Sequence, residues 1–368
     1  MNTRRSKARE PLLPLARHDA ELGGLDLFSR LDDGSTPGQL ADEARVDAVV
    51  GRFRTGVLAS LRSAGRVHGW HTQIMFAEVV RGLGEAVLLA EEDQGTTWAR
   101  PSEPARPGDY RVVLPDGRNL SIEVKNHRGL TAPFRTRVAD LNALLRYADL
   151  TKSEPRLAIY WTRTGMWFLV DPDRFTVRGD RASISMTTAM TENEMAALGD
   201  MMLGLPPPLE FRLEFEELPP FTEFDPKGKR QLTAVIRGTS ISVGGRAVRS
   251  TADRRLAFYL MWNGRWPDTQ HDEFEGGRLK SVRFAFEPEQ WNRDQGFAIA
   301  GFLSELIASS FWLRTSTDGT ITSLRAQLDP RSEGLEIPDD LKSSALGLRL
   351  LRLQPRAGTP LPSEQANP

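Results

Sequence analysis

The sequence predicts an α/β protein whose first half contains a mixed sheet flanked by helices. Two stretches with helical periodicity lie before residue 84, and two strand candidates follow at 109–114 and 120–125. A helix at 136–149 precedes two more strand candidates at 157–162 and 166–170. With a short apolar run ahead of the first strand pair, the predicted order is α-β-β-β-α-β-β. This order is typical of a mixed sheet with helices on its faces.

Apolar periodicity defines the two helices that come before the sheet. The first spans about 40–64, where apolar residues recur every three or four positions. The second is expected from His71 to Leu83, with Gly84 as its stop. Its apolar stripe consists of Ile74, Ala77, Val80 and Leu83.

Turn residues join the next strand candidates into a hairpin. The short apolar run is Ala86–Ala90, and Pro115-Asp116-Gly117 separates the two longer candidates that follow it. Asp-Gly between two alternating runs is a strong hairpin signal. The helix at 136–149 carries its own apolar stripe, formed by Val138, Leu141, Leu144, Leu145 and Ala148.

Composition limits the class of protein. The chain has 368 residues, which is long enough for two domains, and no apolar run of membrane-spanning length. It has no cysteine, which excludes disulfides, thiolate zinc sites and cysteine nucleophiles. Its basic start lacks the apolar segment of a secretory signal, so the sequence predicts a soluble, cytoplasmic protein.

Proline-rich and polar stretches suggest how the chain is divided. We expect a disordered leader at 1–38, a first domain at 39–205, a linker at 206–220, a second α+β domain at 221–355 and a disordered tail at 356–368. The linker begins with three consecutive prolines, Pro206 to Pro208, and continues as an acidic stretch.

Weaker patterns describe the rest of the chain. Residues 189–203 suggest a helix, and Asp318-Gly319 suggests a hairpin. Strand-like runs occur at 231–237, 239–248, 255–262 and 279–286. A long apolar helix is expected from Trp291 to Leu313; because it is apolar on more than one face, it either lies in the core or forms a subunit interface.

The residues that carry chemistry gather on the predicted hairpin. Asp109 opens its first strand, and alternation along the second places Glu123 and Lys125 on one face and Ile122 and Val124 on the other. Two carboxylates can hold a divalent cation through oxygen, and the cation can activate water and polarise a phosphate. A lysine beside them can orient that water or offset developing charge. The set is what metal-dependent phosphodiester hydrolysis requires.

A simpler interpretation of the same residues is an exposed ion pair on a β-hairpin, which contributes little stability. Acid-x-Lys triplets also occur at Asp225-Pro226-Lys227 and Asp340-Leu341-Lys342. Proline cannot sustain a central strand in the first, and the second follows Pro338 at an apparent helix start. Only Glu123-Val124-Lys125 lies on the second strand of a predicted hairpin whose first strand begins with an acidic residue.

This arrangement resembles the PD-(D/E)XK nuclease superfamily, which has the restriction-endonuclease-like fold. The resemblance covers roughly 66–172 and implies that Asp109 and Glu123 are metal ligands, that Lys125 is the motif lysine and that the Val124 carbonyl is a further ligand. It implies Mg²⁺ or Mn²⁺ as cofactor. Families of this group often add a glutamate from the preceding helix, for which Glu78 is the candidate. Gly108 stands where the motif that gives the superfamily its name has proline.

Nucleic-acid contacts have to come from a local basic surface, because the net charge of the chain is −1. Arg128, Arg135 and Arg137 follow the site strand and are the candidates for phosphate binding, with solvated surface arginines as the alternative. His127 is either a phosphate contact or a solvated loop residue. His71 and Gln73 either face the substrate or lie at the surface.

The leading hypothesis is a Mg²⁺-dependent DNA endonuclease, with a role in bacterial defence implied by the resemblance alone. The alternatives are an RNA-directed nuclease and a scaffold subunit of a nucleic-acid-processing complex. No P-loop or other nucleotide-binding motif is present. The second domain is expected to provide recognition, or assembly with a partner protein or as a homo-oligomer.

Overall fold

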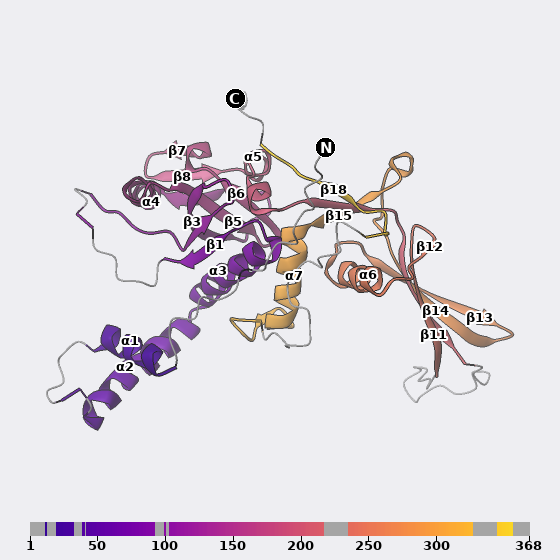
Figure 1. The fold of residues 1–368 in the computed structure, drawn as a ribbon, viewed down its shortest axis with the longest axis horizontal. Helices are drawn as coiled ribbons and strands as arrows, with labels where there is room; N and C mark the ends of the chain where they lie inside the picture. Colours follow the sequence, from indigo (N-terminus) through magenta and orange to yellow (C-terminus); the bar gives the residue numbers. More distant parts are fainter. Residues whose placement is uncertain are drawn as a thin grey trace, which may run out of the picture.

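The protein, described here by a computed structural model, has the predicted α/β fold (Figure 1). The structure describes residues 12, 20–32, 39–40, 42–92, 99–100, 103–216, 235–326 and 344–355. Its first sheet has the strand order β1-β2-β3-β5-β6. The strands are β1 (Leu88–Glu91), β2 (Tyr110–Val113), β3 (Asn119–His127), β5 (Glu154–Trp161) and β6 (Met166–Val170).

Strand β3 lies at the centre of this sheet and makes it mixed. It pairs antiparallel with β2 and parallel with β5. The predicted hairpin is confirmed: the Leu114 N–H donates to the Arg118 carbonyl, and Gly117 has φ +87°, a conformation that glycine adopts without strain. The start of β3 is therefore paired on both sides, whereas Glu123 to His127 continue the pairing with β5 beyond the end of the β2 ladder.

Two helices cover the sheet. Helix α3 (Ala64–Leu83) begins seven residues before the predicted start and ends at Gly84 as predicted, with φ +72°. It buries Ile74, Val80 and Leu83 of the predicted stripe. Helix α4 (Val138–Thr151) matches the prediction within two residues at each end and buries Leu141 and Leu144. The order α3-β1-β2-β3-α4-β5-β6 is that of a restriction-endonuclease-like core, with a small three-stranded sheet beside it. Its strands are β4 (Phe134–Arg137), β7 (Thr176–Arg178) and β8 (Arg181–Ile184).

Helices α1 (Ala20–Leu31) and α2 (Glu43–Leu61) project away from the rest of the chain (Figure 1). Helix α2 confirms the prediction at 40–64. The prediction of a disordered leader at 1–38 is wrong for Ala20–Leu31, which form α1. The Arg45 guanidinium lies 2.5 Å from the Asp32 carboxylate and joins the two helices. Within α2, Val49 is the buried residue.

The predicted helix at 189–203 is wrong. The chain forms α5 (Met186–Thr191), a 3-10 turn at Met195–Leu198 and then β9 (Met202–Leu205). Asn193 interrupts the helix because its side-chain oxygen accepts the N–H groups of Leu169 and Met195, and Gly199 turns the backbone with φ +103°.

The predicted linker at 206–220 is also wrong, because it contains β10 (Leu209–Phe215). This strand is central in a second sheet of order β12-β11-β10-β14-β13. The other strands are β11 (Ile236–Val243), β12 (Arg246–Ala247), β13 (Asp268–Glu275) and β14 (Arg278–Phe286). Strand β13 was not predicted since its residues are mostly polar and exposed. Residues 217–220 of the proposed linker and the predicted tail at 356–368 lie outside the described residues.

The strand-like run at 255–262 is helix α6 (Thr251–Asn263). Its start is capped by Ser250, whose hydroxyl accepts the Asp253 N–H at 3.0 Å. The buried positions Leu256, Ala257 and Leu260 recur at helical spacing. The short apolar run fits both periods, and the cap decides between them.

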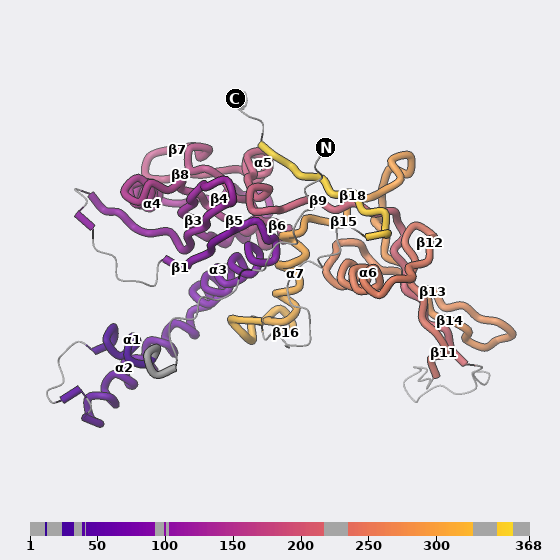
Figure 2. The backbone as a smooth tube through the Cα atoms, in the orientation of Figure 1, coloured from indigo at the N-terminus to yellow at the C-terminus, as the bar shows by residue number. Residues whose placement is uncertain are grey.

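The predicted helix Trp291–Leu313 divides into strand β15 (Ala298–Phe302) and helix α7 (Leu303–Thr315). Strand β15 and strand β18 (Arg349–Leu351) pair with the two edges of β9, and Figure 2 shows the three running side by side. The predicted hairpin at Asp318-Gly319 is confirmed by β16 (Ser316–Thr317) and β17 (Thr320–Ile321).

Helix α7 joins the two halves of the chain into one core. Its Phe311 and Trp312 rings lie 4.8 and 4.7 Å from the His71 ring of α3. Asp200 accepts the N–H and the hydroxyl of Ser304 at 2.9 and 2.6 Å. One cluster of buried residues runs from Ile74 to Leu346. The two predicted domains therefore share a core, and α7 is buried within its own chain.

Burial of His71 gives a testable pH dependence. The ring is fully buried and bonds to the Thr315 hydroxyl at 2.8 Å, and burial lowers its pKa to about 4. The unfolded chain then binds more protons than the folded chain between pH 6.5 and about 4, so this contribution to stability is complete above pH 6.5 and is lost on acidification.

Between pH 6.5 and pH 4 the unfolding free energy of wild type should fall by about 3 kcal/mol more than that of His71→Gln. Urea unfolding at the two pH values measures this difference. The comparison with wild type is necessary because burial raises the pKa of Asp200 to about 6, which makes stability fall with rising pH in the same window. Equal pH dependence in the two proteins would contradict the assignment.

Within the described residues, no helix combines the length and apolar character needed to cross a bilayer.

Candidate active site

Asp109 lies immediately before β2, at the edge where β2 and β3 meet. Its carboxylate is buried, with 7% exposure. One oxygen accepts the Gln73 side-chain amide at 2.6 Å, and the other accepts the Val124 N–H at 2.5 Å. These bonds fix the carboxylate between α3 and β3.

Gly108 explains how Asp109 reaches this position. A Cβ atom at residue 108 would lie 2.7 Å from the Ile122 carbonyl oxygen, which no side chain tolerates. The missing side chain lets the start of β2 press against the backbone of β3. Glycine at this position therefore has a steric cause.

Glu123 and Lys125 lie on one face of β3, as the alternation predicts. The Lys125 ammonium donates to a Glu123 oxygen at 2.5 Å, and the Arg106 guanidinium donates to the same oxygen at 2.7 Å. Glu123 is 5% exposed, so the carboxylate lies inside the protein between two cations. Arg106 was not predicted; the only sequence signal was its place three residues before Asp109.

The Val124 carbonyl faces the same edge as Asp109. The N–H and C=O of one strand residue point toward the same neighbouring strand. Since the Val124 N–H bonds to the Asp109 carboxylate, its carbonyl also points to the β2 side, and the β2–β3 ladder ends at Tyr110 opposite Ile122. This geometry is compatible with the predicted ligand role of Val124.

Helix α3 presents Gln73, and not Glu78, to Asp109. The Glu78 carboxylate instead bonds to Arg81 at 2.9 and 3.0 Å. Five residues along an α-helix correspond to a rotation of roughly 140°, so one helix cannot present both side chains to one point. Among the described residues, no three acidic or histidine side chains form a metal-binding group, and the expected third carboxylate is absent from this set.

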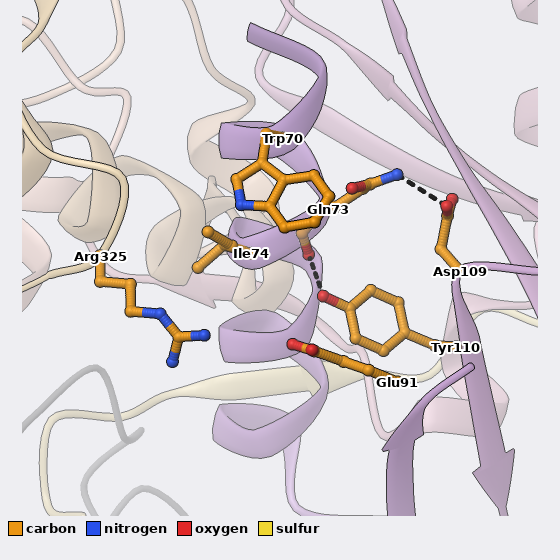
Figure 3. A pocket seen from close by; sticks show the side chains of 7 residues that line it. All are labelled: Trp70, Gln73, Ile74, Glu91, Asp109, Tyr110 and Arg325. Carbon is orange, nitrogen blue, oxygen red and sulfur yellow. Dashed lines mark hydrogen bonds between the residues drawn. The ribbon is translucent and has the colours of Figure 1, made fainter. Parts of the chain in front are cut away.

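A small pocket opens beside Asp109 (Figure 3). Trp70 of α3 lies at this pocket, with Tyr110 and Glu91 below it and Arg325 opposite. The Tyr110 hydroxyl donates to the Gln73 backbone carbonyl at 3.1 Å, which holds α3 against the start of β2. The pocket therefore shares its wall with the residues that position Asp109.

The predicted nucleic-acid contacts differ in their surroundings. Arg128 and Arg135 are exposed, whereas Arg137 forms an ion pair with Asp140 at 2.9 Å. His127 is half-buried: it bonds to the Ala132 carbonyl at 2.9 Å and packs its ring 4.9 Å from the Trp161 ring. Its interpretation as a solvated loop residue is wrong because β3 continues through it.

Positive charge gathers where α4 begins. The pKa of Asp140 lies below its usual range, chiefly because of its hydrogen bond to Arg137, with smaller contributions from Arg106 and Lys125. Asp140 is thus within electrostatic range of the cations that contact Glu123. The site faces the start of α4 with arginine and lysine side chains.

The donor set fits a hard divalent cation. Asp109, bonded to the Val124 N–H, and Glu123, the residue before Val124, could supply carboxylate oxygens, and the Val124 carbonyl could add a neutral oxygen. Mg²⁺ typically uses one or two protein carboxylates and completes its coordination with water and substrate phosphates. Two acids are sufficient for such a site, and its neighbours Lys125 and Arg106 compensate the charge of Glu123 when no cation is bound.

Part of the chain is similar to solved structures, of which one is described below. No family model and no curated protein matches the chain. The solved structure is that of Hjc, a Holliday junction resolvase from the archaeal hyperthermophile Archaeoglobus fulgidus, at 16% identity and a TM-score of 0.26. The match covers 33% of this chain and 96% of Hjc. The function proposed below rests on the geometry of the site and not on this match.

Proposed function

We propose that the protein is a metal-dependent nuclease that hydrolyses phosphodiester bonds in DNA. The observation that supports the proposal is that Asp109 bonds to the backbone of Val124, the residue between Glu123 and Lys125, with both carboxylates buried and hydrogen-bonded. An exposed surface ion pair would need neither the burial nor the bond from Val124 to Asp109. Buried carboxylates that serve only packing are costly, which favours a functional role.

In this proposal Asp109, Glu123 and the Val124 carbonyl hold Mg²⁺ or Mn²⁺, which supplies an activated water and polarises the phosphate. Gln73 and the Val124 N–H keep Asp109 oriented. Lys125 releases Glu123 and positions the attacking water, or offsets the charge that develops on the phosphate oxygens. Arg106, half-exposed beside Glu123, is placed to contact the same phosphate.

The direct test is cleavage by the purified full chain. Plasmid, linear duplex, single-stranded DNA and RNA are each incubated with Mg²⁺, Mn²⁺ or EDTA. We expect DNA cleavage with either cation and none with EDTA. Cleavage of RNA alone would mean that the substrate is RNA and not DNA. If none of the four polymers is cleaved, the proposal is overturned.

Cation binding is also expected to stabilise the fold. Asp109 and Glu123 carry like charges that a divalent cation neutralises, and a ligand that binds only the folded state raises its stability. Mg²⁺ at a hundred times its dissociation constant should add about 2.7 kcal/mol. We expect a rise in melting temperature for wild type that is much smaller for the double variant Asp109→Asn, Glu123→Gln. Equal shifts would place cation binding elsewhere.

A further inference from the structure

The segment from Gly244 to Pro267 is strongly basic in a chain of nearly neutral charge. It contains Arg246, Arg249, Arg254, Arg255 and Arg265 against a single acid, Asp253, a net charge of +4 where the whole chain carries −1. Basic residues gathered in this way form a local phosphate-binding surface that overall charge conceals.

Internal contacts occupy Asp253 but leave most of the arginines at the surface. The Asp253 carboxylate is buried and accepts hydrogen bonds from the Ser344 hydroxyl at 2.7 Å and the Ala345 N–H at 3.2 Å. Arg265 is paired with Glu305. Arg246 and Arg249 are exposed, and neither forms an ion pair with any residue in the described ranges. Their charges face solvent.

Helix α6 adds exposed aromatic rings to this basic segment. Arg255, Phe258 and Trp262 are spaced by three and four residues, so they lie on one face, opposite the buried Leu256 and Leu260. The Trp262 side chain is 74% exposed, the highest value among the large apolar residues described. An exposed tryptophan on an otherwise well-packed helix gains no folding energy from its ring.

The aromatic face continues from the helix onto the second sheet. The Phe258 ring lies 5.2 Å from Phe211 of β10, and Phe211 stacks on Phe284 of β14 at 6.4 Å with 18° between the ring planes. Figure 1 shows α6 between α7 and this sheet. Trp262 lies one helical turn after Phe258, whose ring packs against this sheet.

A cavity adjoins the start of α6. It has a volume of about 420 Å³ and is lined by Arg246, Arg249, Ser250 and Asp253, whose carboxylate is occupied by Ser344 and Ala345, with Pro206 and Gly347 on its other walls. Cavities of this size hold small ligands or parts of larger ones. Two arginines at its rim favour an anionic group such as a phosphate.

We propose that Arg246, Arg249 and the exposed face of α6 form a binding surface for single-stranded nucleic acid. The arginines contact backbone phosphates, and an unpaired base stacks on Trp262. An open indole ring can stack only on a base that is not already stacked in a duplex, and stacking next to a basic groove is the usual way in which proteins hold single strands. A protein partner fits less well because the arginines of the segment outnumber its single acid, Asp253, five to one.

The inferred kind of polymer rests on the proposed nuclease function. The surface adds phosphate contacts to those that Arg106 and Lys125 offer beside Glu123. Binding is measured in EDTA, where no metal-dependent cleavage occurs. Binding without any cleavage in Mg²⁺ would leave this inference intact while overturning the nuclease. If the protein cleaves DNA in Mg²⁺ but the variants described below bind single strands as tightly as wild type, this inference alone is overturned.

The first experiment measures fluorescence anisotropy of a labelled single-stranded DNA, an RNA of the same sequence and the matching duplex with the full chain. Trp262→Ala should weaken single-strand binding roughly tenfold or more, and Trp262→Phe should retain most of it. Phe53→Ala, which removes an exposed ring of α2, is the control and should bind as wild type. Wild-type affinity of Trp262→Ala, or an equal loss in the control, would overturn the proposal.

The second experiment measures the salt dependence of the same binding. Each phosphate contact to a single strand contributes about 0.7 to the slope of log affinity against log salt. Arg246→Ala with Arg249→Ala should lower that slope by about 1.4, while Trp262→Ala leaves the slope unchanged. The control pair Arg62→Ala and Arg178→Ala removes two exposed arginines elsewhere. An unchanged slope in the first pair would contradict the assigned phosphate contacts.

Discussion

Lys125→Ala is expected to lower the rate of DNA cleavage by roughly a hundredfold to a thousandfold, the usual effect of removing one charge-stabilising group from an active site. The variant should fold as wild type because Lys125 is one-third exposed and Glu123 keeps its bond to Arg106 at 2.7 Å. Single-turnover cleavage at saturating Mg²⁺ measures the effect on chemistry alone.

The two carboxylates need conservative replacements. Asp109→Ala would leave the Val124 N–H and the Gln73 amide without an acceptor inside the protein, at a cost of about 1–3 kcal/mol, and would confuse folding with catalysis. Asp109→Asn keeps an acceptor and removes the charge. We expect Asp109→Asn and Glu123→Gln each to abolish measurable cleavage while retaining the melting temperature within a few degrees.

Matched controls test whether these losses are specific. Asp116→Asn changes an exposed acid in the turn of the same hairpin, and Lys152→Asn changes an exposed lysine after α4. Both should cut as wild type. Normal cleavage by a folded Lys125→Ala protein would remove Lys125 from the site, and normal cleavage by Asp109→Asn would exclude the nuclease assignment.

A chain that ends at residue 205 is expected not to fold. The truncation removes both strand neighbours of β9 and all of α7, whose Leu303, Leu306, Ile307 and Phe311 are buried against the first half of the chain. At about 1.5–3 kcal/mol for each buried side chain, their loss amounts to roughly 6–12 kcal/mol. This equals the net stability of an ordinary domain, about 5–15 kcal/mol.

Circular dichroism and thermal unfolding of the 1–205 chain test this expectation, with a chain ending at 355 as the control that keeps every described element. The shorter chain should lack a cooperative transition and aggregate. A soluble 1–205 chain with a sharp transition would mean that the first half folds independently, as the composition at 206–220 suggests.

Local patterns correctly identified the hairpin that carries the site. Asp116-Gly117 determines the turn, and the period of two along β3 determines that Glu123 and Lys125 share a face. These are short-range properties, since each depends on a few consecutive residues. The same kind of pattern failed at 255–262 and 291–302, where short apolar runs fit both helix and strand.

Such local patterns could not identify which residue of α3 contacts Asp109. Glu78 was the natural candidate by residue type, but the rotation of α3 about its axis decides which side chain faces β2. That rotation follows from packing against α7, where His71 sits between Phe311 and Trp312 far along the chain. Gln73, two residues on, is thereby turned toward Asp109.

The sequence by itself determined the α/β order of the first half, the hairpin and the position of Asp109, Glu123 and Lys125 on it, because these follow from turn chemistry and strand alternation. Only the tertiary structure decided that Gln73 and Arg106 complete the surroundings of the two carboxylates, that Leu209–Phe215 is a strand and that the halves share one core. Those outcomes depend on contacts between residues 17 to more than a hundred positions apart, such as Arg106 with Glu123 and Asp200 with Ser304, and no local pattern encodes them.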